Sequence, residues 1–169
     1  MHLRPFAPAD AAPLTALLHR AYAELGARGL NFTAVDQDDA TTLRRATGGA
    51  SWVLERDGVL AATITVSLPP EAALRTLTAE AAVPRRAWLN QLAVDPAHRG
   101  RGLARRLRDV GYAWCREQGC TSIGLDTAEP AEHLVRLYGA WGFVPVDQVR
   151  WPGKRYRSVV LARDVPPEP

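Results

Sequence analysis

The segment Leu89-Asn-Gln-Leu-Ala-Val-Asp-Pro-Ala-His-Arg-Gly-Arg-Gly-Leu-Ala104 carries the most information in this chain. Its first six residues are mostly apolar and predict a strand, which Asp95 and Pro96 end with a turn. Gly100 and Gly102 then open a predicted helix. Glycine lets the backbone approach a ligand closely, and the free N–H groups at a helix N-terminus attract anions. The segment therefore suits a phosphate or pyrophosphate.

Five arginines lie in and just after this glycine loop, at positions 99, 101, 105, 106 and 108. The whole chain has 21 Lys and Arg against 18 Asp and Glu, and Lys154 is its only lysine. A net charge of +3 does not by itself identify a nucleic-acid-binding protein. Most of the cluster is expected to form a solvated helix face, with one or two side chains that reach a phosphate. The preference for arginine over lysine can also reflect codon usage alone.

Two common nucleotide-binding motifs do not fit the loop. A P-loop ends in Gly-Lys followed by Ser or Thr, and the sequence contains no such triplet. A dinucleotide fingerprint, G-x-G-x-x-G, would need glycine at the position of Arg105 and would lie near the start of a βαβ unit. Both classes of nucleotide site are excluded at this loop.

The rest of the chain predicts one α/β domain over residues 1–164, followed by a proline-rich tail over residues 165–169. A length of 169 residues with 47% apolar and 23% charged residues is ordinary for a single globular domain. Asp10 is expected to cap a first helix that Gly26 and Gly29 end, and Asp57-Gly58 predicts a hairpin turn. Periodicity predicts further helices over 36–46, 103–118 and 129–141, a short one within 69–86, and strands over 51–56, 59–68, 88–94, 122–126, 143–150 and 156–162.

The remaining composition indicates a soluble cytoplasmic protein without a metal. Cys115 and Cys120 have no second pair, so reduced thiols are expected, although a disulfide between them is possible on paper. The four histidines show no metal-ligand spacing. No apolar signal core and no membrane-length apolar run are present.

Two motifs resemble those of the Gcn5-related N-acetyltransferases, the GNAT superfamily. The pattern R-x-x-G-x-A, filled by Arg99, Gly102 and Ala104, resembles that family's acetyl-CoA loop. Leu137-Tyr138-Gly-Ala-Trp-Gly-Phe143 resembles its recurring Leu-Tyr-x-x-x-Gly-Phe. The order of elements agrees over nearly the whole chain. The resemblance implies the α/β GNAT fold, with a mixed, mostly antiparallel sheet of about six to seven strands and about four helices.

The resemblance also implies an activity and a cofactor, namely transfer of acetyl from acetyl-CoA to a primary amine by direct attack in a ternary complex. Strand backbone would pair with the pantetheine arm like an added strand, and loop amides would cradle the pyrophosphate. The implied cofactor-binding residues are Leu92, Ala93, Val94, Arg99, Gly100, Arg101, Gly102, Leu103 and Ala104.

The expected catalytic residues are Tyr138 and Asn90. Tyr138 matches the tyrosine that often protonates the departing CoA thiolate, although an aromatic at this helical spacing can also serve the core. The chain departs from the family pattern at Ala131, where many relatives have an asparagine that contacts the CoA arm. No acidic residue lies between Ala81 and Val94, where many relatives place a general base. Asn90 could therefore at most orient a water, or it is a polar strand residue bonded to backbone.

The amine must lose a proton before it attacks, and several routes stay open: water, another carboxylate such as Asp126 or Glu24, or deprotonation before binding. The resemblance places the acceptor, a small-molecule or peptide amine, near two loops, although their aromatics can equally close a core edge. The nominated acceptor residues are Asn31, Phe32, Trp151 and Tyr156. A homodimer is possible, and nucleic acid is an unlikely partner. The alternative function is an acyl-CoA-binding regulatory module without turnover.

Overall fold

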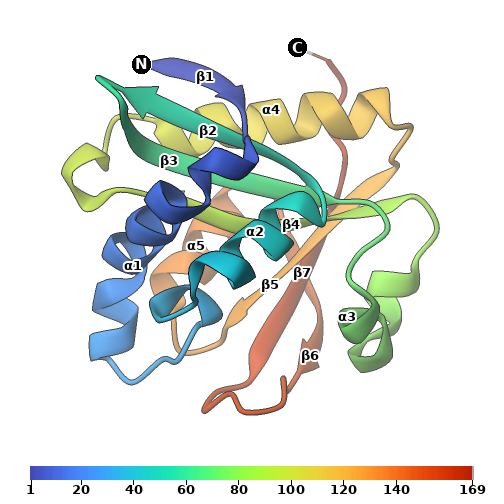
Figure 1. The fold of residues 1–169 in the computed structure, drawn as a ribbon. Helices are drawn as coiled ribbons and strands as arrows, with labels where there is room; N and C mark the ends of the chain where they lie inside the picture. The colour runs from blue at the N-terminus through green and yellow to red at the C-terminus, as the bar shows by residue number, and fades with distance from the viewer. Residues whose placement is uncertain (169) are drawn as a thin grey trace. The chain divides into compact units, whose positions relative to one another are not determined.

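The computed structural model describes residues 1–168, which group into two compact units. Within these residues, unit 1 comprises Met1–Val66 and Asn90–Gly111, and unit 2 comprises Ser67–Leu89 and residues 112–168. Within the described residues the strands form one sheet of seven, in the order β1-β2-β3-β4-β5-β7-β6 (Figure 1). β4 and β5 pair parallel, whereas β1–β2, β2–β3, β5–β7 and β6–β7 pair antiparallel. The predicted mixed, mostly antiparallel α/β sheet is confirmed.

Unit 1 contains the N-terminal strands, two helices, the second half of β4 and the start of α4. Two-residue turn chemistry is confirmed between β2 and β3, because Asp57 and Gly58 have φ values of 52° and 76°. The bounds are β1 His2–Pro5, α1 Ala11–Ala27, α2 Asp39–Thr47, β2 Ala50–Arg56, β3 Val59–Ser67, β4 Arg86–Val94 and α4 Leu103–Glu117, with 3₁₀ turns at Pro8–Asp10, Thr33–Val35 and Pro96–His98.

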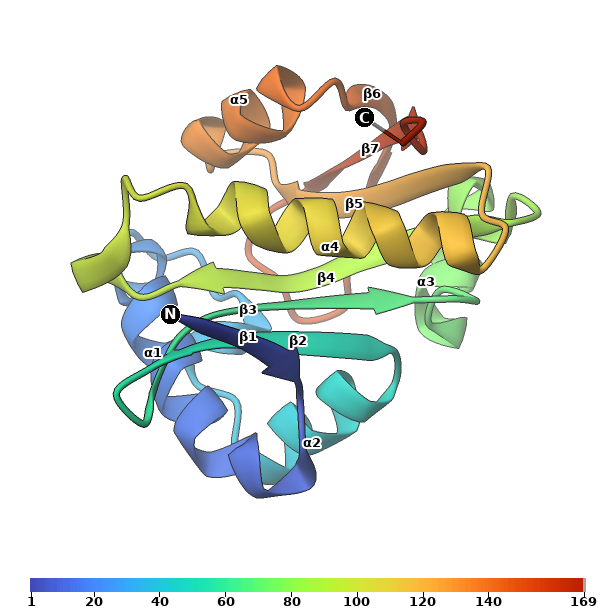
Figure 2. The same ribbon diagram turned by 90° about the horizontal axis from the view of Figure 1, so that it is seen from above.

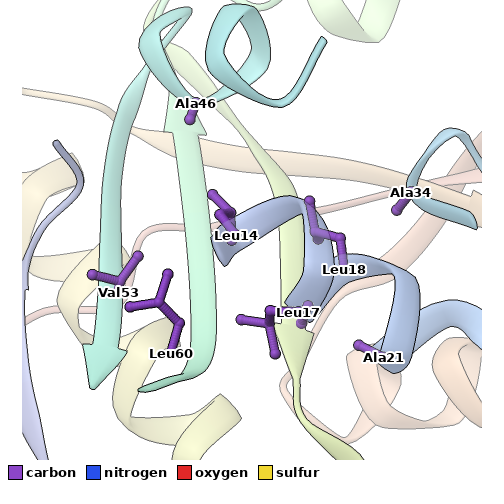
Figure 3. Packing of buried hydrophobic residues seen from close by; sticks show 9 residues of the cluster. Leu14, Leu17, Leu18, Ala21, Ala34, Ala46, Val53 and Leu60 are labelled. Carbon is purple, nitrogen blue, oxygen red and sulfur yellow. The ribbon is translucent and has the colours of Figure 1, made fainter. Parts of the chain in front are cut away.

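Helices cover both faces of the strands in unit 1. α1 and α2 lie on one side of β2 and β3, and the first part of α4 lies on the other (Figure 2). The apolar stripe of α1 packs on side chains from both strands (Figure 3). The residues of this cluster include Leu14, Leu17, Leu18, Ala46, Val53, Leu60 and Ala93. On the opposite face Gly111 lets α4 approach β3, since an added Cβ would lie 3.2 Å from Val66 Cγ2.

Unit 2 is organised around Trp88, whose indole crosses the backbone of β5 at Gly124. A Cβ at Gly124 would lie 2.4 Å from Trp88 Cζ3, so only glycine fits beneath the ring. Leu74, Val149 and Val160 complete this core. The remaining elements are α3 Ala72–Leu77, a 3₁₀ turn at Ala79–Ala82, β5 Ser122–Ala128, α5 Glu132–Ala140, β6 Val144–Val149 and β7 Ser158–Asp164.

Several predicted boundaries were wrong by a few residues. Asp10 occupies the N-cap position of α1, but its side chain accepts from Arg4 and from the Ala7 N–H instead of capping the helix. α1 continues through Gly26, and Gly29 follows its end with φ 79°.

Other ends shift for local reasons. α2 begins at Asp39, because Asp38 accepts from the Thr41 N–H and so sets the helix start. α5 begins at Glu132, two residues after Pro130, where Ala131 is the N-cap. β5 is two residues longer than predicted, because it stays paired with β7 as far as Ala128. With α3 included, the described residues contain five α-helices, where about four were expected.

Candidate active site

The glycine loop lies directly before α4, which begins at Leu103. Gly100 and Gly102 both have φ 74°, and no heavy atom lies within 4 Å of a Cβ built on either residue. The first helical bond of α4 runs from the Arg106 N–H to the Gly102 carbonyl at 3.0 Å. N–H groups before the first such bond have no acceptor within the helix. The amides of Leu103 and Ala104 are among these groups, so this end of α4 suits an anion.

The side chains around the loop hold it against α1. Arg99 Nη2 donates to the Ala21 carbonyl at 2.8 Å, and Arg99 also pairs with Glu24 at 3.4 Å. Arg20 Nε binds Asp95 Oδ2 at 2.8 Å. The guanidinium of Arg99 therefore fixes the loop on α1.

The other arginines of the cluster also have protein partners or face solvent. Arg106 donates to the Met1 carbonyl, and Arg108 pairs with Asp109 at 2.6 Å. Arg101 and Arg105 are exposed. This distribution agrees with the expected solvated helix face.

The strand that precedes the loop contains a local distortion. Gln91 has φ 46°, a left-handed conformation that is uncommon for any residue other than glycine, and its side chain is buried. Next to it, the Leu92 carbonyl accepts a hydrogen bond from the Tyr22 hydroxyl at 3.1 Å. Ala93 is buried, whereas Asn90, Leu92 and Val94 are half-buried. In the sequence, Tyr22 follows Leu14 and Leu18 at helical spacing, a pattern that indicates only the apolar face of α1.

Tyr138 lies on α5 in unit 2, and its ring is packed. The ring makes edge contacts with Trp141, at a centroid distance of 5.7 Å, and with Phe143, at 6.1 Å. The Phe143 N–H returns to the Tyr138 carbonyl at 3.1 Å, and Gly142 between them has φ 85°. The glycine of the motif thus lets the chain fold back on the tyrosine. The ring has a core role, and the catalytic role of the hydroxyl stays a prediction.

The four nominated acceptor residues divide between the two units. Asn31 and Phe32 follow α1 in unit 1, where Phe32 packs on Tyr22 with ring centroids 5.4 Å apart. In unit 2 the Trp151 indole donates to Asp126, and Tyr156 is 7% exposed. Trp151 and Asn31 are half-buried. Packing accounts for Phe32 and Tyr156 in part, so the acceptor assignment stays a prediction.

The two cysteines are free thiols shielded from solvent. Burial raises the pKa of Cys115 to about 12 and also raises the pKa of Cys120. A neutral thiol is a poor nucleophile, because the thiolate is the reacting form. Burial therefore holds both thiols in the less reactive form.

The profile of the Acetyltransferase (GNAT) family matches residues 14–143, which is more than half of the chain. This chain belongs to the GNAT acetyltransferase family. The match includes the strand, the glycine loop and the tyrosine motif described above. The GNAT chain contains no helix among residues 1–168 that is long and apolar enough to cross a membrane.

Individual proteins agree with the family assignment. The chain is 28% identical over 111 residues to "Probable N-acetyltransferase family 8 member 5" of Mus musculus, a match that spans 64% of this chain and 44% of that relative. It therefore spans less than half the length of that relative.

Solved GNAT structures share the fold. The ribosomal-protein-S18-alanine N-acetyltransferase of Escherichia coli has a TM-score of 0.72 at 17% identity, with 99% of this chain and 96% of that chain covered. Ard1 of Thermoplasma volcanium has a TM-score of 0.74 at 20% identity, over 98% of both chains. The protein yncA of Salmonella typhimurium, described as "a putative ACETYLTRANSFERASE" and solved with acetyl-CoA, has a TM-score of 0.70 at 18% identity, over 100% of this chain and 96% of that one.

Proposed function

We propose that this GNAT protein is an acetyl-CoA-dependent N-acetyltransferase that transfers acetyl to a primary amine by direct attack in a ternary complex. The observation that carries the proposal is the loop before α4, where Gly100 and Gly102 adopt φ 74° ahead of a helix N-terminus. An N-terminus of this kind offers fixed N–H donors and a positive dipole end to a pyrophosphate. The proposal is supported by the fold shared with yncA, a protein whose structure was solved with acetyl-CoA.

The residues present fit acetyl-CoA. Amides from Arg99 to Ala104 would bind the pyrophosphate, and the absence of any heavy atom within 4 Å of a Cβ built on Gly100 or Gly102 leaves room for it. Backbone groups of Leu92, Ala93 and Val94 would pair with the pantetheine arm as an added strand would. Acetyl-CoA supplies an activated acetyl group as a thioester.

The chain's own residues would assist both proton transfers of the reaction. The amine nitrogen loses one proton as its bond to the acetyl carbon forms, and the sulfur gains one as the C–S bond breaks, so the reaction is balanced without an external acid. Tyr138 Oη is proposed as the donor to the sulfur. Asn90 is proposed to orient a water that takes the proton of the amine.

The acceptor is proposed to be a small-molecule or peptide amine that contacts Asn31, Phe32, Trp151 and Tyr156. The names of two relatives specify N-acetyl transfer, and one specifies an alanine of a ribosomal protein. Amine acceptors in general suit the aromatic side chains at these positions, because an ammonium group is attracted to an aromatic face. The proposed location is the cytoplasm.

Two measurements test this function. Acetyl-CoA should raise the melting temperature of the purified protein, because a ligand that binds only the native state stabilises it. A panel of primary amines, including peptides with free N-termini, should then release CoA thiol in proportion to the N-acetyl product, measured by mass spectrometry. The proposal is wrong if millimolar acetyl-CoA leaves the melting temperature unchanged.

The alternative function, an acyl-CoA-binding regulatory module, is favoured by Ala131 and by the lack of a carboxylate on β4. Such a module would show the thermal shift without turnover on any amine. Acceptor-dependent thiol release would therefore exclude it.

A further inference from the structure

Two side chains from one region of unit 1 bind two consecutive residues of β4. The Tyr22 hydroxyl donates to the Leu92 carbonyl at 3.1 Å, and Gln37 Nε2 donates to Gln91 Oε1 at 3.3 Å. Tyr22 lies in α1 and Gln37 follows the 3₁₀ turn at Thr33–Val35. The intervening segment carries Asn31 and Phe32. This segment is therefore attached to β4 near both of its ends.

The attachment falls where β4 is least regular. Gln91 has φ 46°, and a residue with a Cβ pays an energetic cost there unless its surroundings hold it. Its side chain is buried, with 5% exposed, and both polar atoms are used: Oε1 accepts from Gln37, and Nε2 donates to Thr65 Oγ1 at 3.4 Å. The distortion is thus fixed by side-chain hydrogen bonds from two directions.

Gln37 is itself held in place. Its Nε2 also donates to Thr42 Oγ1 at 2.7 Å, and its Oε1 accepts from Arg45 Nη1 at 2.5 Å. The Gln37 carbonyl contacts His19 Nε2 at 2.8 Å. With 5% of Gln37 exposed, these bonds form a buried network, and such networks order their members when every polar group is satisfied.

The Tyr22 hydroxyl is a hydrogen-bond donor that stays neutral. Burial raises the pKa of its phenol, so the hydroxyl stays protonated over the physiological range. Its ring packs on Phe32, and its hydroxyl donates to the Leu92 carbonyl. Tyr22 thus orients the Leu92 carbonyl. The hydrogen bonds of the Gln91 side chain hold the residue before it.

We propose that Tyr22 and Gln37 are positioning residues that hold the Gln91–Leu92 segment of β4 in the conformation that receives the pantetheine arm of acetyl-CoA. The inference rests on the proposed function, in which Leu92–Val94 pair with that arm. Neither residue is proposed to touch the cofactor. Both act through β4, and Phe32 gives the acceptor-side loop a direct contact with one of them.

Tyr22→Phe tests the inference, because it removes only the hydroxyl. Loss of one hydrogen bond of ordinary strength should weaken acetyl-CoA binding about 3- to 10-fold by calorimetry. The KM for acetyl-CoA should rise by a similar factor while kcat stays within about twofold of the wild-type value. Gln37→Glu, which removes the amide donor but keeps an acceptor for Arg45, should have an effect of the same direction.

Thr63→Val is the matched control. Thr63 is fully buried in the same unit and donates to the Trp52 carbonyl at 3.1 Å, the same distance and the same type of bond. Its loss should lower stability without weakening acetyl-CoA binding. Hydrogen exchange without cofactor should speed up at residues 90–94 in Tyr22→Phe and not in Thr63→Val.

The two proposals fail differently. If the wild-type protein does not bind acetyl-CoA, the proposed function is wrong and this inference falls with it. If the wild-type protein binds acetyl-CoA and Tyr22→Phe binds it equally well, only the positioning role is wrong. Equal weakening in Tyr22→Phe and Thr63→Val would show a general stability effect and would also overturn the inference.

Discussion

Trp151 Nε1 donates to Asp126 Oδ2 at 2.8 Å, and so ties the loop between β6 and β7 to β5. The other oxygen of the same carboxylate accepts from Trp88 Nε1 at 3.0 Å. Trp88 is 1% exposed and Trp151 is half-buried, so the two bonds are not equivalent. Asp126 was one of several open routes for proton removal, and in the structure it joins two indoles.

Trp151→Phe should lower the free energy of unfolding by about 1 kcal/mol, because it removes one hydrogen bond and keeps an aromatic ring. Asp126→Ala should cost more, about 2–3 kcal/mol, because it removes both hydrogen bonds and leaves the buried Trp88 N–H without this acceptor. Urea unfolding followed by circular dichroism measures both values. An equal loss of unfolding free energy in the two variants would show that the Trp88–Asp126 hydrogen bond contributes no stability of its own.

Gly124→Ala should be among the most damaging single substitutions in unit 2. The new methyl group would lie 2.4 Å from Trp88 Cζ3, and overpacking of this kind costs about 1–3 kcal/mol or more. Gly139→Ala in α5 is the control, since no heavy atom lies within 4 Å of its built Cβ and alanine favours helices. Thermal unfolding should therefore shift in opposite directions for the two variants. A neutral Gly124→Ala would show that Trp88 can move aside.

Gly102→Ala should weaken acetyl-CoA binding by about tenfold or more, because a Cβ strains the left-handed φ of 74° and enters the space proposed for the pyrophosphate. Gly119→Ala at the other end of α4 imposes the same backbone strain, at φ 69°, outside the proposed site. Both variants should lose similar stability. Only the first should lose affinity in calorimetry, and a loss in both would assign the effect to α4 stability.

Tyr138→Phe should lower kcat by about 10- to 10⁴-fold if the hydroxyl protonates the leaving sulfur. The ring contacts with Trp141 and Phe143 would be kept, so stability should change little. The kcat of wild type and Tyr138→Phe should be measured with the same amine acceptor at saturating acetyl-CoA, and the unfolding of both proteins should be measured in parallel. An unchanged kcat would assign Tyr138 to the core alone.

Asp10→Asn should destabilise the protein at neutral pH by about 1.5–3 kcal/mol, the usual value for hydrogen bonds to charged groups. Arg4 donates to both carboxylate oxygens, at 2.7 and 2.8 Å, and these bonds hold the pKa of Asp10 below its usual range. A lowered folded-state pKa contributes stability above the unfolded pKa of about 4 that is lost as pH falls through the folded value.

The difference between wild type and Asp10→Asn should therefore be largest near pH 7 and shrink below about pH 4. Urea unfolding at pH 7 and pH 3 measures it. A stability difference that grows toward acid pH would contradict this prediction, and would show that the ionised Arg4–Asp10 pair is not its source.

The sequence predicted those parts of the fold that local chemistry determines. Asp57-Gly58 predicts its hairpin because both residues tolerate positive φ, and Gly119 ends α4 for the same reason. Asp10 was assigned correctly to a helix start but not to its partner. Arg4 lies in β1, and no local pattern reveals that its guanidinium competes for the carboxylate.

The candidate site divides in the same way. Gly100 and Gly102 could be predicted because glycines directly before a helix indicate an anion-binding loop. No sequence pattern marks Tyr22 or Gln37 in this way. Tyr22 sits at an apolar helical position and reads as core, and Gln37 sits in an irregular segment. Their link to β4 depends on contacts between residues 54 and 70 positions apart, which only tertiary structure shows.

The shielding of Cys115 and Cys120 has a practical consequence for measuring turnover. The chain has two cysteines, both are buried, and the high pKa of Cys115 keeps that sulfur protonated. An aromatic disulfide reagent, which absorbs light after reaction with a thiolate, should therefore react with released CoA far faster than with the folded enzyme. The native protein should therefore add little absorbance to a colorimetric screen. Even acceptors with low turnover rates should be detectable without replacing either cysteine.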